Sequence, residues 1–160
     1  MAALTSSRNT PEMADGGRMR VYPVEANTNV YLGSMAALNT NGNAVPASAT
    51  TTTANALKIV GRTERVHNGM PGQDAINSGG AAGALSIVVR KGVFMFDQDS
   101  SITAAQIGSV CFAIDDHTVS ATDRQSGAGV QQNAAAGQVV AIDPSGQVWV
   151  DFWHQSTAAA

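Results

Sequence analysis

Three consecutive residues, Asp115, Asp116 and His117, are the densest group of potential metal ligands in the chain. Carboxylates and imidazoles bind divalent metals when they converge on one point. Consecutive side chains of an extended segment point in different directions, and the spacing matches neither an EF-hand loop nor an H-E-x-x-H helix. No second cluster of Asp, Glu or His lies nearby in the sequence. The pattern therefore favours a polar turn over a metal site, and we predict no metal and no cofactor.

Other candidate catalytic residues are no better framed. Paired carboxylates such as Asp97 and Asp99 can in principle act as an acid and a base. Their setting, DQDSS between a strand and a helical turn, is explained more simply as a solvated turn with capping potential. The serines lack a G-x-S-x-G elbow, and His67, His117 and His154 lie in predicted loops or near the terminus. We predict that the chain is not an enzyme. A triad assembled only in space is the remaining catalytic alternative.

Two tryptophans near the end of the chain are candidates for binding. Side chains alternate between the two faces of a strand, so Trp149 and Trp153 share one face while Val148, Val150 and Phe152 share the other. The aliphatic face is the better core candidate. The tryptophans then form a partner contact or pack internally, two readings with equal support, and sugar binding is a third.

The elements that carry these residues read as short β-strands. Runs rich in Val, Ile and Phe alternate with Gly, Asp, Pro and Ser, which is typical of a small all-β domain. The sequence Asp143-Pro144-Ser145-Gly146 fits a type I turn that joins the last two strands as a hairpin. The predicted strands of this half are residues 84–89, 93–96, 109–114, 138–142 and 147–152.

The first half shows a similar pattern with more interruptions. The pair Asn41-Gly42 tolerates positive φ and predicts a hairpin turn, and Gly61 predicts a bend or bulge. Residues 68–83 form the longest predicted loop, which lacks the motifs of a phosphate cradle. The extended segments predicted here are residues 18–22, 29–32, 35–38, 44–46 and 57–66.

Together these elements predict an all-β fold, a small β-barrel or β-sandwich-like domain with long loops and an extended N-terminal arm. The arm covers residues 1–17, the β domain residues 18–155 and a C-terminal tail residues 156–160. Residues 102–108 predict one helical turn, capped by Thr103 or Ser101 and stopped at Gly108. The single cysteine, Cys111, cannot form an internal disulfide, and its apolar surroundings favour a buried thiol over a reactive one.

Composition limits the partners of the chain. Only 13% of the residues are charged, about half of the roughly 25% typical of soluble domains. A net charge of −3 and scattered Lys and Arg argue against nucleic acid, and no apolar run is long enough to span a membrane. Abundant small polar residues fit a surface covered by neighbouring subunits, with a loop-rich monomer as the alternative.

Residues 1–17 read as an arm and not as core. They lack the basic start and apolar centre of a secretory signal, and they cannot bury enough apolar area to offset about 1–2 kcal/mol of backbone entropy per ordered residue. Short anchors that could contact a neighbouring subunit are nevertheless present. They are Met1, Leu4, Arg8, Glu12 and Met13.

Five segments together resemble a family of virion proteins, the capsid decoration (cement) proteins of Mu-like tailed phages and prophages. These segments are MAALNTNGNAVPA, LKIVGRTERVHNG, VVRKGVFMF, IGSVCFAIDDHTVSAT and AGQVVAIDPSGQVWVDF, which cover roughly residues 20–153. The resemblance lies in the pattern of short strands and turns and not in a catalytic motif. The arm before Arg18 has no counterpart in it.

The resemblance implies a β-barrel-like, non-enzymatic subunit on the outer surface of a phage head, made in the bacterial host cytoplasm. Its partners would be the major capsid protein and further copies of itself, as a homotrimer or alternatively a dimer, with no nucleic acid and no membrane. Trp149 and Trp153 would then be candidate contacts. A virion-surface module that binds carbohydrate or a receptor is the alternative function.

Overall fold

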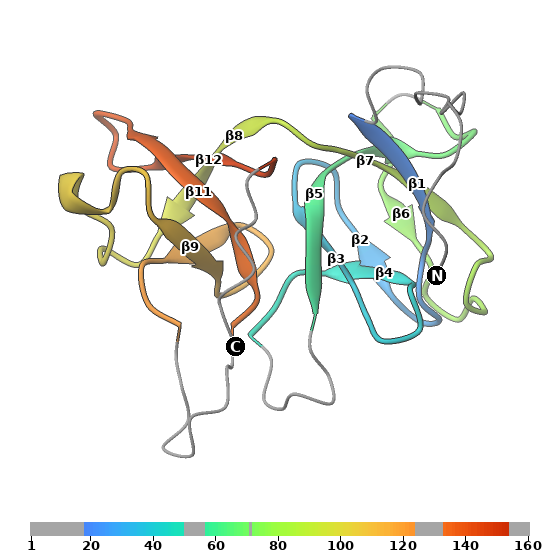
Figure 1. Cartoon of the computed structure of the whole chain (residues 1–160). Helices are drawn as coiled ribbons and strands as arrows, with labels where there is room; N and C mark the ends of the chain where they lie inside the picture. Colours follow the sequence, from blue (N-terminus) through green and yellow to red (C-terminus); the bar gives the residue numbers. More distant parts are fainter. Residues whose placement is uncertain (1–17, 50–56, 71, 124–132, 154–160) are drawn as a thin grey trace, which may run out of the picture.

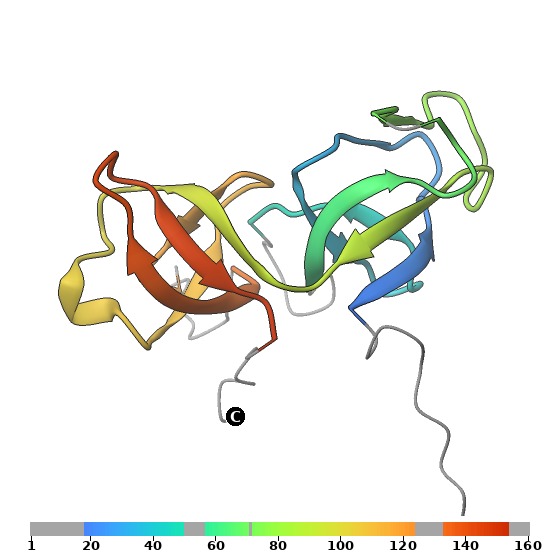
Figure 2. The same cartoon turned by 90° about the horizontal axis from the view of Figure 1, so that it is seen from above.

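The computed structural model shows an all-β protein, which confirms the predicted fold class (Figure 1). It describes residues 18–49, 57–70, 72–123 and 133–153. Two groups of strands lie side by side, and the chain passes from one to the other through consecutive strands, as Figure 2 shows from above. Within the described part of the chain, no helix is long and apolar enough to cross a membrane.

The first group, residues 18–91, is a five-stranded sheet that curls on itself. Its strands are ordered β1-β7-β5-β3-β4, all neighbours antiparallel. The outer edges of the sheet meet at an isolated parallel bridge between Val24 and Ala44. The strands are β1 (Met19–Pro23), β3 (Met35–Leu38), β4 (Ala44–Pro46), β5 (Lys58–Val66) and β7 (Ser86–Arg90), with a small separate sheet of β2 (Asn29–Val30) and β6 (Ala75–Ile76).

The second group, residues 92–153, is a closed five-stranded barrel. Its order is β10-β8-β12-β11-β9, and β10 closes the ring by pairing antiparallel with β9 and parallel with β8. A 3-10 helix, η3 (Ala104–Gln106), lies between β8 and β9. The strands are β8 (Val93–Gln98), β9 (Val110–Ala113), β10 (Thr118–Ser120), β11 (Ala135–Ile142) and β12 (Val148–Asp151).

The two groups are copies of one topology. In chain order, the first strand of each pairs with the fifth, the fifth with the fourth, the fourth with the second and the second with the third, all antiparallel. The third strand then meets the first in parallel, through Val24 and Ala44 in one group and Gln98 and Val119 in the other. We call these groups the N-terminal repeat (residues 18–91) and the C-terminal repeat (residues 92–153).

The equivalence extends to individual residue pairs. Arg62 opposite Arg90 corresponds to Gln138 opposite Asp151, and the same bulges follow in β5 and β11. Backbone hydrogen bonds between the second and fourth strands also recur at equivalent positions. These are Gly33 N to Thr63 O (2.9 Å) with Gly108 N to Val139 O (2.8 Å), and Thr63 N to Ser34 O (2.8 Å) with Val139 N to Ser109 O (2.9 Å).

A glycine occupies the same place in each fourth strand. A Cβ at Gly61 would collide with the carbonyl oxygen of Arg90, and one at Gly137 with that of Asp151, which is the residue equivalent to Arg90. Gly61 also has φ of 140°, where side chains are strained. Each curled sheet therefore depends on a close backbone approach that only glycine permits.

The repeats share a hydrophobic cluster. The barrel interior is filled by side chains such as Phe96, Val148 and Phe152, and Met35 and Ile59 of the N-terminal repeat belong to the same buried cluster. Two backbone hydrogen bonds cross the junction, Met35 N to Asp116 O (2.6 Å) and Ala49 N to Ile114 O (2.9 Å). The Arg62 guanidinium, paired with Glu64, lies 4.3 Å from the centre of the Phe94 ring.

A second cluster fills the inside of the N-terminal repeat alone. Its members are Val24, Val30, Ala36, Ala44, Val66, Ala75, Ile87 and Val89. The single β domain expected for residues 18–155 is not tested by this arrangement. The repeat was not foreseen from the sequence.

Most of the predicted local structure is confirmed. Thr103 caps η3 through a capping box, and Gly146 N donates to Asp143 O (2.8 Å) in the predicted turn between β11 and β12. Gly61 lies at a register shift between β3 and β5, as its sequence context indicated. The long loop of residues 68–83 is interrupted by β6, because Ala75 and Ile76 pair with β2. The arm (1–17) and the tail (156–160) lie outside the described residues.

We predict that Gly137→Ala lowers the free energy of unfolding by at least about 2 kcal/mol, because the new methyl group forces the β11 backbone away from β12. Gly146→Ala is the matched control. Gly146 has φ of 91° but open space around it, so that substitution should cost only the conformational strain, about 1 kcal/mol. Urea unfolding of both variants measures the difference. An equal loss in the two variants would contradict the close approach.

Candidate functional site

The outer face of the C-terminal repeat carries a ladder of paired side chains on β8 and β12. Directly opposed residues of antiparallel strands lie on the same face. Trp149 lies opposite Met95, and Asp151 lies opposite Val93. The next position toward the β11–β12 turn pairs Gln147 with Asp97, and Gln147 Nε2 donates to Asp97 Oδ1 (2.7 Å). This outer face is therefore apolar in its middle and polar at both ends.

The sequence prediction for β12 is confirmed. Val148, Val150 and Phe152 are fully buried, whereas Trp149 and Trp153 are 37% and 43% exposed. The outward position of both rings agrees with a partner contact, and packing of the covered part of each ring against its own chain stays the alternative. Trp153 lies just beyond β12, and its backbone N–H donates to Asp151 Oδ1 (2.8 Å).

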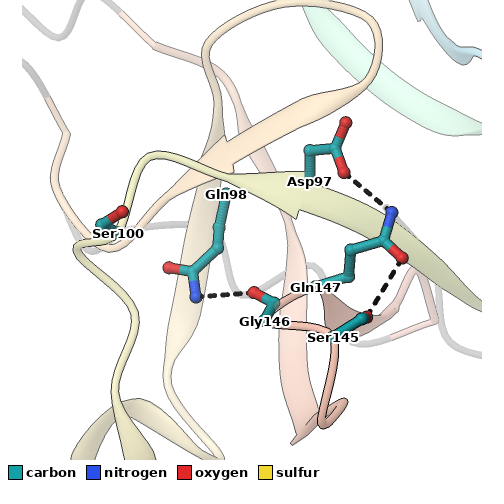
Figure 3. A pocket seen from close by; sticks show the side chains of 6 residues that line it. All are labelled: Asp97, Gln98, Ser100, Ser145, Gly146 and Gln147. Atoms are coloured by element: carbon teal, nitrogen blue, oxygen red, sulfur yellow. Dashed lines mark hydrogen bonds between the residues drawn. The ribbon is translucent and has the colours of Figure 1, made fainter.

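A depression of about 450 Å³ lies at the polar end of this face (Figure 3). It forms where the end of β8 meets the β11–β12 turn. Gln98 Nε2 donates to the carbonyl oxygen of Gly146 (3.0 Å) and Gln147 Nε2 to Asp97 (2.7 Å). The lining residues are Asp97, Gln98, Ser100, Ser145, Gly146 and Gln147.

The polar groups around the depression bond mainly to one another. The Ser145 hydroxyl donates to Asp143 Oδ1 (2.7 Å), and its backbone N–H donates to the same oxygen (3.0 Å). These two bonds hold the pKa of Asp143 below its ordinary value, with a smaller contribution from Trp149. The arrangement stabilises a turn, and the lowered pKa of Asp143 makes this carboxylate a weak base for activating the Ser145 hydroxyl.

The Asp115–His117 segment differs from its predicted geometry. We expected the three side chains to point apart, but their ligand atoms lie within 4.8 Å of one another. The reason is that the segment forms a tight turn and not an extended strand. His117 Nδ1 is 2.9 Å from Asp116 Oδ1 and 3.1 Å from Asp115 Oδ1.

The same turn explains what these side chains do. Asp115 Oδ1 accepts the backbone N–H groups of His117 (2.9 Å) and Thr118 (2.7 Å), so this carboxylate caps the turn between β9 and β10. The hydrogen bond to Asp116 raises the pKa of His117, helped by the charges of Asp115, Asp116 and Asp97 and opposed by slight burial. The two aspartates are half-buried and His117 is exposed, and the cluster serves the turn, as the sequence favoured.

The other candidate groups are not assembled into a reactive centre within the described residues. Asp99 accepts the N–H of Ser101 (3.1 Å), which fits the predicted turn. Cys111 is fully buried, and burial raises the pKa of its thiol to about 12. This confirms the buried-thiol prediction. His154 lies outside the described residues.

Sequence reasoning missed part of the outer face. Val93, Met95 and Gln147 join Trp149 only through the register of β8 and β12, which a single strand does not reveal. The alternation of VFMF was the available signal, because Phe96 points inward and Met95 outward. The other predicted contact residues, Met1, Leu4, Arg8, Glu12 and Met13, lie outside the described residues.

Comparisons with known proteins return no match, whether with family models, curated proteins or solved structures.

We predict that Asp116→Asn lowers the pKa of His117 toward that of a free imidazole, because the substitution removes the largest cause of the increase. NMR titration of the imidazole protons measures this shift, with Asp143→Asn as a control that leaves His117 unaffected. Since folding raises this pKa, protonated His117 stabilises the fold below about pH 6.5, and the effect is lost as the pH rises through the raised pKa. An unchanged pKa in Asp116→Asn would contradict the assignment.

Proposed function

We propose that this chain is a non-enzymatic virion protein that decorates and stabilises a phage head by binding across joints between major capsid subunits. The observation that carries the proposal is the exposure of large apolar side chains on the outer sheet faces of both repeats, Met19 and Val21 in one and Val93, Met95 and Trp149 in the other. Exposed apolar patches mark interaction surfaces. The proposed location is the outer surface of the capsid.

Two joined repeats suit this role physically. A protein that contacts a shell at several places gains affinity through multivalency, so no single contact needs to be strong. Burial of about 800 Å² per partner is enough for a specific contact. The low charge of the chain and its short strands favour such close packing, and the groups within the described residues that could do chemistry are used in turns and in the core.

Further copies of the chain are the second proposed partner, as a homotrimer, with a dimer as the alternative. The arm would reach another subunit or the shell through Met1, Leu4 and Met13, and through charge pairing of Arg8 and Glu12. Nucleic acid and membranes are not among the proposed partners. The net charge of the whole chain is −3, which disfavours long-range attraction to a phosphate backbone or to anionic lipid.

We predict that heads lacking this protein break at lower temperature, and at lower chelator stress, than complete heads. The cause is the loss of contacts that bridge neighbouring shell subunits. Thermal release of packaged DNA measures head stability, and adding back the purified chain should restore it. Equal stability with and without the protein would remove the decoration role.

A carbohydrate- or receptor-binding module is the alternative function. It is favoured by the position of Trp149 beside Met95 and one step from the hydrogen-bonded Asp97–Gln147 pair, which borders the polar depression. An aromatic ring next to polar side chains can stack on one face of a sugar and bind its hydroxyl groups. The depression itself is open and its groups already have partners, which is why decoration is preferred.

A glycan array separates the two functions. We expect no specific glycan binding by the wild-type chain. The alternative instead requires binding that is lost in the Trp149→Ala/Trp153→Ala variant and kept in Tyr31→Ala, a control with an exposed aromatic ring on the N-terminal repeat. That second pattern would replace decoration as the leading function.

A further inference from the structure

The two repeats have the same backbone plan but opposite charge. Residues 18–91 contain seven Lys and Arg against three Asp and Glu, whereas residues 92–153 contain one Arg against seven Asp. The net charge of −3 therefore conceals a basic half and an acidic half. One chain therefore carries two halves of the same topology and of opposite charge.

The complementarity is sharpest on one pair of equivalent faces. On the N-terminal repeat, Met19 lies opposite Arg90, and Val21 lies opposite Val88. On the C-terminal repeat, Val93 lies opposite Asp151, and Met95 lies opposite Trp149. We name Met19, Val21, Arg90 and Arg65, which pairs with the buried Val88, the basic face. The second set is the acidic face.

Both faces keep apolar side chains exposed at matching positions. Met19 and Val21 are 45% and 48% exposed, and their equivalents Val93 and Met95 are 44% and 41% exposed. Beside them the equivalent charged positions differ in sign, Arg90 in one repeat and Asp151 in the other. An apolar stripe flanked by a charge is the composition of a specific protein interface, in which burial supplies affinity and charge fixes partner and register.

We propose that the basic face of one copy binds the acidic face of the next, so that the chain associates head to tail. The occupant of each face is a second copy of this chain, because each face offers the charge that the other requires. Contacts of this kind use two different surfaces of every subunit, and they close into a ring when the rotation between copies permits. The inference does not depend on the proposed function, since the purified chain alone tests it.

Charge reversal at the equivalent positions is the test. Arg90→Asp and Asp151→Arg should each weaken self-association by roughly tenfold or more, because like charges then face one another. The double variant Arg90→Asp/Asp151→Arg should regain it, since both faces are exchanged together. An equimolar mixture of the two single variants should also associate, because each then presents what the other needs. Analytical ultracentrifugation of the full chain measures all four.

Two further measurements, on variants of exposed residues and at raised ionic strength, separate lost association from misfolding of a variant. Val21→Asn and Met95→Asn change exposed apolar residues, one on each face, and both should weaken association, whereas Met70→Asn, at a highly exposed residue outside both faces, should not. Raising the ionic strength should also weaken association by screening the charges.

A wild-type chain that stays monomeric at high concentration and low salt would overturn the inference, as would single reversals without effect or a double variant that fails to recover. A monomeric chain that still stabilises heads would leave the decoration function intact. A chain that assembles head to tail but does not attach to heads would support the self-association and contradict the decoration function.

Discussion

The close approach between the fourth and fifth strands of each repeat is the constraint on which the rest of the structure depends. Five strands form a narrow ring only if the sheet curls strongly, and bulges in β5 and β11 provide that curl. At Gly61 and Gly137 the neighbouring carbonyl takes the space of a side chain. β12 itself pairs regularly with β8, and its alternation places Met95 and Trp149 on the surface and Val148 and Val150 in the core.

Repetition of one backbone plan leaves the side chains free to diverge where the two copies have different neighbours. Met35, Ala37 and Ile59 are buried because the C-terminal repeat packs against the outer side of β3 and β5. Their equivalents in β9 and β11, Val110, Phe112 and Ala135, are only partly buried, since no further repeat packs against them in the described part of the chain. The outer side of the second and fourth strands thus occurs in both repeats, but only the one in the N-terminal repeat is part of the junction. At the edge of the junction, the Arg62 guanidinium lies over the Phe94 ring.

Local structure was readable from the sequence where one strand or one turn contains all the information. The strand Met35–Leu38 and the turn at Asp143 follow from hydrophobic alternation and turn chemistry, and so does the outward position of Trp149. Residues 115–117 form the polar turn that the sequence favoured, but the expectation that their side chains point apart was wrong because it assumed an extended chain. The repeat was not predicted because the two halves have few side chains in common. The available signal was the Gly-Ser pair that precedes equivalent strands, Gly33-Ser34 before β3 and Gly108-Ser109 before β9.

The segregation of charge between the two repeats is visible in the fold but not in the order of residues along the sequence. In sequence order the basic residues look scattered, with only Arg90 and Lys91 adjacent. Once the chain is divided at the β7–β8 connection, almost every described cation lies on one repeat and seven aspartates lie on the other. Because the two halves share a topology, their residues can be compared position by position. Arg90 and Asp151 are equivalent, so their opposite charges mark a difference between two matching faces. Two copies of one topology that differ in charge supply the basic and acidic faces on which the proposed head-to-tail association rests.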